Sequence, residues 1–347
     1  MVSSCGNTQE TIDALYSKET SLKSYDDLVP QKTVCIGKFL SSKKFDDLLE
    51  LSVAEVLSLS NLENYADTLL LVGSSVGGMA NSEKIIFSED DYKNIDIERH
   101  TIDTIASHLD KKFNFLATRS FSTACTSSAN ALKVAKELIG FGAYKNILVV
   151  GADEICSTTI FGFSALGILN DEVCTPFQNN RKGMNVAEGI GVLLLQNIAD
   201  KNAIELVGAG TSSDAFHIAN PDPTAAGAMK AISNALSDAS LKPSDIDYIN
   251  AHGTGTNAND AIEAKAVAEI FGEDVYISSS KSNLGHTLGA AGAIEAIICV
   301  EALRRGVVPP QIRCDDNETS LNFVDNAKEV DISYAQSNSF AFGGNNT

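Results

Sequence analysis

The sequence has little positive charge and no long apolar run. Its 347 residues hold 26 lysines and arginines against 45 aspartates and glutamates, a formal net charge of −19. Nucleic-acid binding needs clustered basic residues that neutralise phosphates, so this charge argues against a nucleic-acid partner. No run of about 18 apolar residues predicts a membrane span. The first residues lack the basic start and apolar stretch of a signal peptide, so we expect a cytoplasmic protein.

Paired cysteines are missing as well. The seven cysteines form no C-x-x-C pair, which argues against a zinc ribbon and against a redox dithiol. In a reducing cytosol they are expected to be free thiols, and a free thiol can be a nucleophile. They are Cys5, Cys35, Cys125, Cys156, Cys174, Cys299 and Cys314.

The chain does contain an alternation of short apolar runs and helical patterns. Hydrophobic residues make up 44% of it, enough for a large core. Apolar runs predict strands at 69–72, 147–150, 191–195, 204–208, 246–250 and 275–278. Periodic segments, most of them Ala-rich, predict helices at 128–139, 224–237, 259–271 and 289–303. Strands that alternate with helices favour an α/β fold in layers.

The chain length indicates two domains or one large duplicated unit. The theme of strand and helix repeats in the second half, and we place the boundary near Asp200-Lys201-Asn202. The predicted halves are therefore residues 1–200 and 201–347. Gly140 is expected just past the end of the first predicted helix, and Asn259 or Asp260 is expected as the N-cap of the third.

Cys125 lies among small residues directly before the helix predicted at 128–139. A thiol at a helix N-terminus has a lowered pKa, because the positive end of the helix dipole favours the thiolate. The setting is similar to a nucleophile elbow, a sharp turn from strand to helix that exposes a nucleophile. The residues alone leave open the alternative of a buried, inert cysteine.

Two of the five histidines follow predicted strands and stand beside glycine. His252 lies in Ala-His-Gly-Thr-Gly-Thr, and His286 lies in Leu-Gly-His-Thr. Ligands bind at strand ends in α/β folds, and glycine lets the backbone approach a ligand closely. A zinc site formed with Cys125 is an alternative, although it lacks a fourth ligand. His100 and His108 are expected to be ordinary residues of a polar segment, and His217 has no assigned role.

The last motif is Asn-Ser-Phe-Ala-Phe-Gly-Gly-Asn-Asn at 338–346. Phe340 and Phe342 precede paired glycines, so the segment is expected to be a flexible loop that carries bulky side chains. Such a loop can gate a pocket. The alternative is a strand end followed by a hairpin turn.

Four motifs together resemble those of the β-ketoacyl-acyl carrier protein synthases, the elongating condensing enzymes of fatty-acid and polyketide biosynthesis. They are Thr-Ala-Cys-x-Ser (123–127), His-Gly-Thr-x-Thr (252–256), Lys-Ser-x-x-Gly-His (281–286) and Asn-Ser-Phe-x-Phe-Gly-Gly (338–344). The resemblance runs from Gly6 to the end. It implies a thiolase-like fold of two similar α/β halves in a layered α-β-α-β-α core, usually in a dimer. The first half would carry the nucleophile and the second half the two histidines.

The resemblance also implies a reaction, the decarboxylative Claisen condensation of a 3-oxoacyl-[acyl-carrier-protein] synthase. An acyl group would pass from the phosphopantetheine thiol of acyl carrier protein to Cys125. Malonyl-carrier protein would then lose carbon dioxide, and the resulting carbanion would attack the Cys125 thioester. No cofactor and no metal is implied beyond the phosphopantetheine that the carrier brings.

Residue roles follow from the same resemblance. His252 and His286 would donate to the thioester oxygen as negative charge develops on it. Lys281 would order the site, with Glu295 as its partner. The remaining implied roles concern substrate binding: backbone N–H groups of Cys125 and Phe342 as the oxyanion hole, Phe342 with Gly343 as the gate, Phe340, Thr254 and Thr256 as substrate-binding residues, and Arg181 with Lys182 as the landing patch for the acidic carrier protein.

Compared with the family, a strand before Met1 and a final strand after Thr347 are missing, and we expect a product trimmed at both ends. The segment 32–67 is also short, which is similar to ketosynthases of aryl-polyene clusters. Alternatives remain open. They are a non-catalytic subunit that sets chain length beside an active synthase, an inactive truncated ketosynthase, and a thiolase that uses Cys314 as its base. The partner subunit would be a second copy or a related ketosynthase-like chain.

Overall fold

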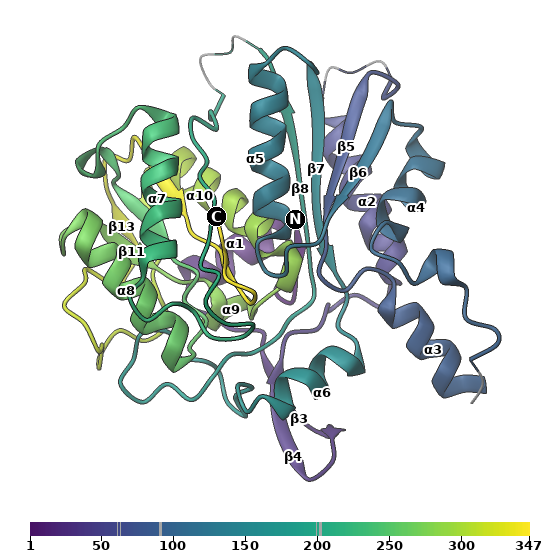
Figure 1. Ribbon diagram of the computed structural model, residues 1–347, viewed down its shortest axis with the longest axis horizontal. Helices are drawn as coiled ribbons and strands as arrows, with labels where there is room; N and C mark the ends of the chain where they lie inside the picture. Colours follow the sequence, from purple (N-terminus) through teal and green to yellow (C-terminus); the bar gives the residue numbers. More distant parts are fainter. Residues whose placement is uncertain (61, 63, 90–91, 199, 201–202) are drawn as a thin grey trace.

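The N-terminal half is built around a six-stranded sheet (Figure 1). The computed structural model describes residues 1–347 except 61, 63, 90–91, 199 and 201–202. The strand order is β2-β1-β8-β7-β5-β6, with β7, β5 and β6 parallel and the other neighbours antiparallel. The strands are β1 (Val2–Ser3), β2 (Gly6–Asn7), β5 (Thr68–Gly73), β6 (Ala117–Phe121), β7 (Asn146–Asp153) and β8 (Gly189–Gln196).

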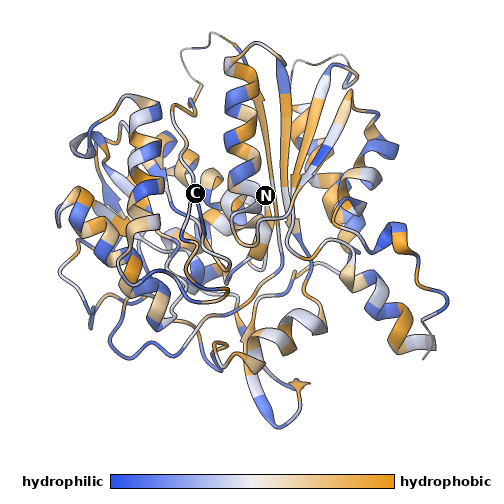
Figure 2. Ribbon diagram, viewed as in Figure 1, coloured by the Kyte–Doolittle hydropathy of each residue, from blue (hydrophilic) through white to orange (hydrophobic). Residues whose placement is uncertain are grey.

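The sheet is buried because helices cover both of its faces. On one face, α2 (Phe45–Ser58) and α4 (Thr104–Phe113) pack against β5, β7 and β8. On the other face lie α5 (Ser127–Gly140) and α10 (Ala291–Arg305). Every residue of β5 and β7 is buried, and Figure 2 shows hydrophobic residues along these strands. Burying each large aliphatic side chain stabilises the fold by about 1.5–3 kcal/mol. The strands β5, β7 and β8 contain the predicted ranges 69–72, 147–150 and 191–195, which are therefore confirmed.

A second, parallel sheet has the order β11-β10-β14. Helix α10 packs against it through Cys299 and Ala302, which contact Tyr248. Helices α7 and α8 cover the opposite face. These elements are β10 (Tyr248–Asn250), β11 (Tyr276–Ser278), β14 (Ala335–Ser337), α7 (Ala226–Ala239) and α8 (Asn257–Phe271). Because α10 contacts both sheets, the expected α-β-α-β-α layering is confirmed.

The remaining elements connect these layers. Helix α1 (Thr8–Tyr16) packs on α10, and α6 (Ser157–Ala165) contacts the hairpin of β3 (Lys23–Val29) and β4 (Lys32–Ile36). The others are α3 (Met79–Glu89), α9 (Lys281–Leu284), η1 (Ile97–Arg99), η2 (Pro243–Asp245), η3 (Leu288–Ala290), β9 (Ser212–Ser213), β12 (Val307–Val308), β13 (Lys328–Glu329), β15 (Phe340–Ala341) and β16 (Asn345–Asn346). No helix in the described part of the chain is long and apolar enough to cross a membrane.

Helix α10 approaches the first sheet closely because glycines face it. A side-chain carbon at Gly151 of β7 or at Gly191 of β8 would lie 2.9 Å from the Cβ of Ala293, closer than carbon atoms pack. The N–H of Ala293 donates to Ser128 Oγ at 2.9 Å. Small residues on three elements therefore set the spacing of α10, β7, β8 and α5.

Three local predictions are wrong. Residues 204–208 form no strand, and no described strand pairs with them; they lie along α7, where Asp238 accepts the N–H of Ala209 at 2.9 Å. Gly140 is still helical, because it is the last residue of α5, and Phe141 follows it as the C-cap. The N-cap of α8 is Thr256, whose hydroxyl accepts from the N–H of Asn259 at 3.4 Å. The expected boundary at 200–202 includes residues 201–202, which lie outside the described residues.

Candidate active site

Cys125, His252 and His286 come together from distant parts of the chain. Cys125 lies in the turn between β6 and α5, His252 follows β10, and His286 follows α9. The His286 Nε2 atom lies 3.0 Å from Cys125 Sγ, and the two imidazole centroids are 5.2 Å apart at an interplanar angle of 88°. One ligand-type atom from each of the three lies within 4.8 Å of the others.

The turn that carries Cys125 is strained, as a nucleophile elbow is. Ala124 has a φ of 54°, a left-handed conformation that costs a non-glycine residue about 1–2 kcal/mol. Helix α5 begins at Ser127, so Cys125 stands just before a helix N-terminus, as expected. The residue is partly exposed, whereas its sulfur is enclosed by protein. Burial raises the pKa of the Cys125 thiol to about 12, although the Lys281 charge acts in the opposite direction. The expectation of a lowered pKa is therefore wrong, because burial outweighs the favourable charges around the thiol.

Both histidines are held as neutral rings with the proton on Nε2. Burial, with the nearby Lys281 ammonium as a second cause, holds both imidazole pKa values well below their usual range. The N–H of Leu288 donates to His286 Nδ1 at 3.2 Å, and Lys281 Nζ, which can only donate, lies 3.4 Å from His252 Nδ1. A ring whose Nδ1 accepts carries its proton on Nε2. His286 therefore donates toward Cys125 Sγ.

Lys281 and Glu295 form a buried ion pair behind His252. Their Nζ and Oε1 atoms are 2.5 Å apart, and both side chains are almost fully enclosed. Burial raises the pKa of Glu295, and the Lys281 charge opposes that rise. Glu295 lies on α10, so the central helix orients Lys281, and Lys281 orients His252. This is the pairing expected from the sequence.

Two buried carboxylates of α8 hold the loop that follows β10. Glu263 accepts from the N–H groups of His252 at 2.8 Å and Gly253 at 2.7 Å, and Asp260 accepts from those of Thr254 and Gly255. Burial raises the pKa of Glu263 to about 7 and also raises that of Asp260. The pair is spaced i,i+3 on a helix that directly follows the histidine motif. That spacing was available in the sequence as a signal of one shared helix face.

Thr254, Thr256 and Phe340 lie beside the histidines. The hydroxyls of Thr254 and Thr256 are 2.9 Å apart. The Phe340 ring lies 6.1 Å from that of His252. Glu263 also accepts from Asn338 Nδ2 at 3.1 Å, which ties the loop of 338–344 to the His252 loop.

Phe342 is 37% exposed and its ring lies 6.0 Å from that of Phe163 on α6. The next residue, Gly343, has a φ of 83° and donates its N–H to the carbonyl of Ile218 at 2.8 Å. The segment around Phe342 combines short strands with a turn, because β15 pairs with β16 across Gly343 and Gly344. The alternative of a strand end followed by a hairpin turn is thus what the backbone adopts. The gating role of Phe342 stays a prediction.

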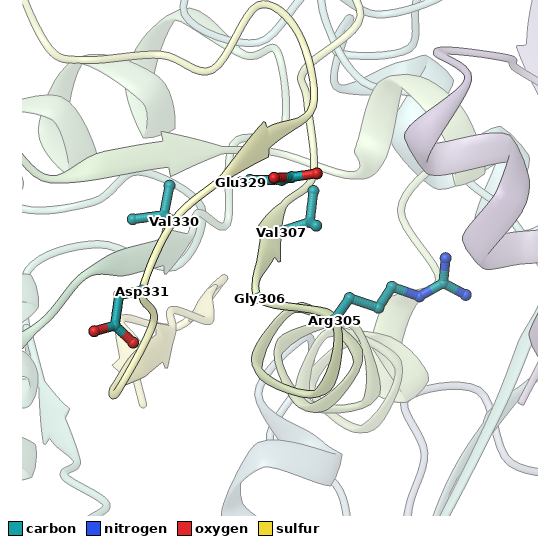
Figure 3. A pocket seen from close by; sticks show the side chains of 6 residues that line it. All are labelled: Arg305, Gly306, Val307, Glu329, Val330 and Asp331. Carbon is teal, nitrogen blue, oxygen red and sulfur yellow. The ribbon is translucent and has the colours of Figure 1, made fainter.

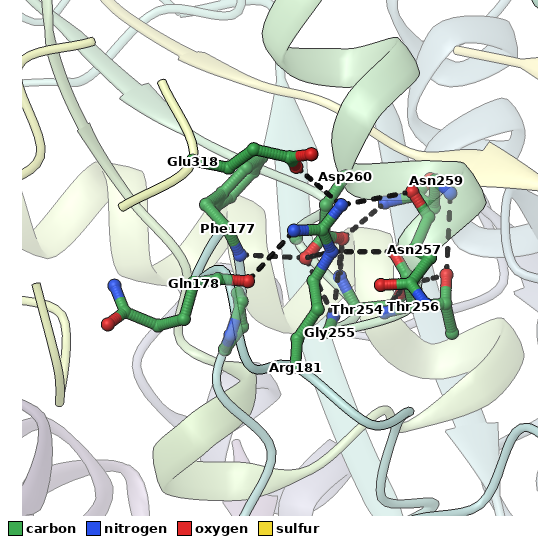
Figure 4. Close-up of polar contacts among 12 residues, drawn as sticks. Phe177, Gln178, Arg181, Thr254, Gly255, Thr256, Asn257, Asn259, Asp260 and Glu318 are labelled. Atoms are coloured by element: carbon green, nitrogen blue, oxygen red, sulfur yellow. Dashed lines mark hydrogen bonds and ion pairs between the residues drawn. The ribbon is translucent and has the colours of Figure 1, made fainter. Parts of the chain in front are cut away.

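Arg181 does not present its charge at the surface (Figure 4). Its guanidinium contacts the carboxylates of Asp260 and Glu318 and donates to the carbonyls of Gln178, Thr256 and Asn257. A side chain that uses its donors internally is not free to bind a carrier protein, so the patch assignment is wrong for Arg181. Lys182 is exposed, with its Nζ 3.5 Å from Glu172.

The other histidines have local partners. His100 Nδ1 lies 2.8 Å from Ser82 Oγ, His108 pairs with Glu50, and His217 Nδ1 accepts from the backbone of Ala219 and Asn220.

A surface hollow of about 380 Å³ lies at the end of α10 and contains none of the site residues (Figure 3). Its lining residues are Arg305, Gly306, Val307, Glu329, Val330 and Asp331.

Two family models match the chain in sequence. The model described as beta-ketoacyl synthase, N-terminal domain matches residues 48–201, and the one described as beta-ketoacyl synthase, C-terminal domain matches residues 203–315. Together they cover well over half of the chain. The chain belongs to the β-ketoacyl synthase family.

Members of the β-ketoacyl synthase family also appear among its relatives. The 3-oxoacyl-[acyl-carrier-protein] synthase 2 of Staphylococcus aureus is 38% identical over 242 residues, 65% of this chain and 58% of the relative. The match thus spans less than two thirds of the curated relative. A ketosynthase (ApeO) in complex with its chain length factor (ApeC) from Xenorhabdus doucetiae has a TM-score of 0.88 and 29% identity, covering 99% of this chain and 94% of that one.

A further solved complex, AntDE:AntF, joins a type II polyketide acyl-carrier protein to its ketosynthase. Its TM-score is 0.89 at 25% identity, and the match covers 99% of this β-ketoacyl synthase and 95% of that chain. The thiolase-like fold expected from the sequence is confirmed by these structures.

Proposed function

We propose that this chain is an elongating 3-oxoacyl-[acyl-carrier-protein] synthase that uses Cys125 as its nucleophile. The observation that carries the proposal is the placement of His286 Nε2 at 3.0 Å from the Cys125 thiol, with a ring nitrogen of His252 within 4.8 Å of the same group. In this assignment residues 1–200 supply the nucleophile and residues 201–347 supply the donors. The chain needs no cofactor or metal of its own, because the carrier protein brings the phosphopantetheine arm.

The first step is acyl transfer. Cys125 Sγ attacks the carrier's thioester carbon, the new Sγ–C bond forms, and the carrier's S–C bond breaks. The proton of the thiol ends on the released phosphopantetheine thiol. Since the resting thiol has a pKa of about 12, the His286 Nε2–H donor is what stabilises negative charge on sulfur during attack.

The second step is decarboxylation followed by carbon–carbon bond formation. The bond from the malonyl α-carbon to its carboxylate breaks, carbon dioxide leaves, and the electron pair moves to the thioester oxygen as an enolate. Donors aimed at that oxygen lower the barrier, and each is worth about 3–4 kcal/mol. The enolate carbon then attacks the Cys125 thioester carbon, and the C–Sγ bond breaks. The sulfur leaves as a thiolate that takes up a proton from solvent, and the 3-oxoacyl group leaves on the carrier.

The substrates and partners follow from the same proposal. Acyl-carrier protein is the acyl donor, and the chain works in the cytoplasm as a homodimer or beside a related ketosynthase-like subunit. A complex of ketosynthase and chain length factor is known for ApeO and ApeC, which favours the second arrangement. The non-catalytic role of a chain-length-setting subunit is disfavoured, because Cys125, Lys281 and both histidines are all present and in contact range.

Intact-protein mass after incubation with medium-chain acyl-carrier protein tests the nucleophile. One acyl group per chain is expected for the wild type and none for Cys125→Ala. Cys314→Ala is the matched control and should still be acylated, since the Cys314 thiol donates to the backbone carbonyls of Gln311 and Val324 and is not part of the Cys125 cluster. An acyl gain that survives Cys125→Ala, or no gain in the wild type over a range of chain lengths, would contradict the proposal. Malonyl-carrier protein added to the acylated enzyme should then yield the 3-oxoacyl product.

A further inference from the structure

Asp153 is a fully buried carboxylate that takes no direct part in the proposed steps. It is the last residue of β7, at the edge where the parallel strands β5, β6 and β7 all end. Its oxygens accept from Ser74 Oγ at 2.5 Å and from the N–H groups of Ser75 and Val76 at 3.0 Å. No ion pair among the described residues includes Asp153. Backbone and hydroxyl donors alone therefore stabilise this buried charge.

The fourth donor to Asp153 comes from the other half of the chain. The N–H of Gly289 donates to Asp153 Oδ2 at 2.6 Å, three residues after His286. There is no room for a side chain at Gly289, since a Cβ would lie 2.5 Å from the nitrogen of Ser75 and 2.8 Å from Oδ2. The bond thus fixes the backbone of the His286 loop against the end of the first sheet.

Leu288, which lies between His286 and Gly289 in the sequence, shows what the hydrogen bond from Gly289 to Asp153 holds in place. Leu288 is buried and has a φ of 53°, a left-handed conformation that persists only where the surroundings enforce it. In that conformation its N–H points at His286 Nδ1, at 3.2 Å. The acceptor role of Nδ1 places the proton on Nε2, which faces Cys125 Sγ at 3.0 Å. Asp153 is thus linked to the protonated nitrogen of His286 through two consecutive peptide groups.

We propose that Asp153 is a positioning residue that fixes the ring of His286 and its Nε2–H tautomer. The catalytic part of the inference rests on the proposed condensing function, whereas the tautomer part does not. Asparagine at 153 is nearly isosteric, but its amide has one acceptor oxygen for the four donors and its NH₂ group would face other N–H groups. At least one donor is then unpaired, and the bond from Gly289 is the one that crosses between the halves.

The test is a two-bond ¹H–¹⁵N spectrum of histidine-labelled protein, with His286 assigned by its absence in His286→Ala. The wild type should show the Nε2–H tautomer, and Asp153→Asn should show a mixture or the Nδ1–H form. Malonyl-carrier protein decarboxylation per acylatable Cys125 should fall about 100-fold, the cost of misplacing a catalytic group by about 1 Å. Glu154→Gln is the matched control, because Glu154 faces outward to Lys84, and it should change neither readout.

Several results would overturn the proposal. One is a wild-type Nδ1–H tautomer. Another is an Asp153→Asn protein that keeps both the Nε2–H tautomer and the decarboxylation rate. A third is an Asp153→Asn protein whose decarboxylation rate falls only in proportion to the number of acylatable Cys125 sites. That result would mean a purely structural role for Asp153. If Asp153→Asn does not fold, Ser74→Ala decides, since it removes one donor and keeps the charge; unchanged His286 shifts and rate would refute the inference. A wild type that neither acylates nor decarboxylates would refute the proposed function, while the tautomer comparison would still test Asp153.

Discussion

Replacing Lys281 by methionine separates the two roles that its ammonium group has in the structure. The group pairs with Glu295 at 2.5 Å and lies 3.4 Å from His252 Nδ1. Methionine fills a similar volume without charge. It leaves the Glu295 carboxylate buried without its partner and leaves His252 Nδ1 without the neighbouring donor.

The stability loss can be worked out from burial. Both side chains are only 2–3% exposed, so solvent does not screen the pair. Removing one partner of such a pair costs about 3–5 kcal/mol. Glu295 can take up a proton instead, because burial already raises its pKa, and this keeps the loss within that range. At about 2 °C per kcal/mol for a chain of this length, the Tm should fall by about 6–10 °C.

The double variant Lys281→Met with Glu295→Gln removes the orphaned charge. Its stability, measured by urea denaturation, should return to within about 1–2 kcal/mol of the wild type. Malonyl-carrier protein decarboxylation should stay about 100-fold low in both variants, because neither fixes the His252 tautomer. If the double variant regained decarboxylation together with stability, Lys281 would act by neutralising Glu295 and the reasoning about His252 would be wrong.

Three further outcomes are expected. His252→Ala should lower the rate of decarboxylation about 100–1,000-fold. The rate of Cys125 acylation should stay within about tenfold of the wild type, since His252 does not contact the thiol in the resting site. Equal losses in the mass and decarboxylation assays would contradict this. Burial raises the pKa of Asp153 from 3.8 to about 6 and that of Glu263 from 4.5 to about 7, so near neutral pH the folded state binds more protons than the unfolded state. The free energy of unfolding, measured by urea titration, should therefore be lower at about pH 8 than at about pH 5.5. A higher value at about pH 8 would contradict this expectation. Arg181→Ala should cost about 3–5 kcal/mol, because buried Asp260 keeps its backbone donors but loses the guanidinium charge beside it. Glu318→Gln, on the exposed side of the same guanidinium, should cost at most about 1 kcal/mol. Similar losses in the two variants would show that Asp260 does not depend on Arg181.

The sequence predicted the features that local pattern determines. Continuous apolar runs such as 147–150 predicted the central strands, because a strand buried on both faces needs no polar residue. Small residues before a helical segment marked Cys125, and glycine-flanked positions after predicted strands marked His252 and His286. The family motifs added Lys281. The run at 204–208 has the same pattern but forms no strand, since strand formation needs a partner that composition does not reveal.

Features that depend on contacts between distant segments could not be predicted. Arg181 looked like a free surface charge, because nothing in its neighbours indicates that Asp260 and Glu318 would enclose it. The helix start after Cys125 suggested an acidic thiol, yet the thiol pKa is determined by how completely the second half of the chain covers the sulfur. Asp153 carries no motif, and its importance appears only when Gly289 is placed beside it.

Helix α10 contacts both sheets, so the geometry of the site depends on the small residues that face this helix. The helix carries Glu295, while its Ala293 N–H is bound by Ser128, three residues beyond Cys125. The distance between the thiol and the imidazoles therefore depends on how closely this helix packs against Gly151 and Gly191. A methyl group added there would alter the chemistry without touching a reacting atom. A larger residue at Gly151 or Gly191 would therefore need a smaller residue than Ala293 opposite it to keep the same spacing.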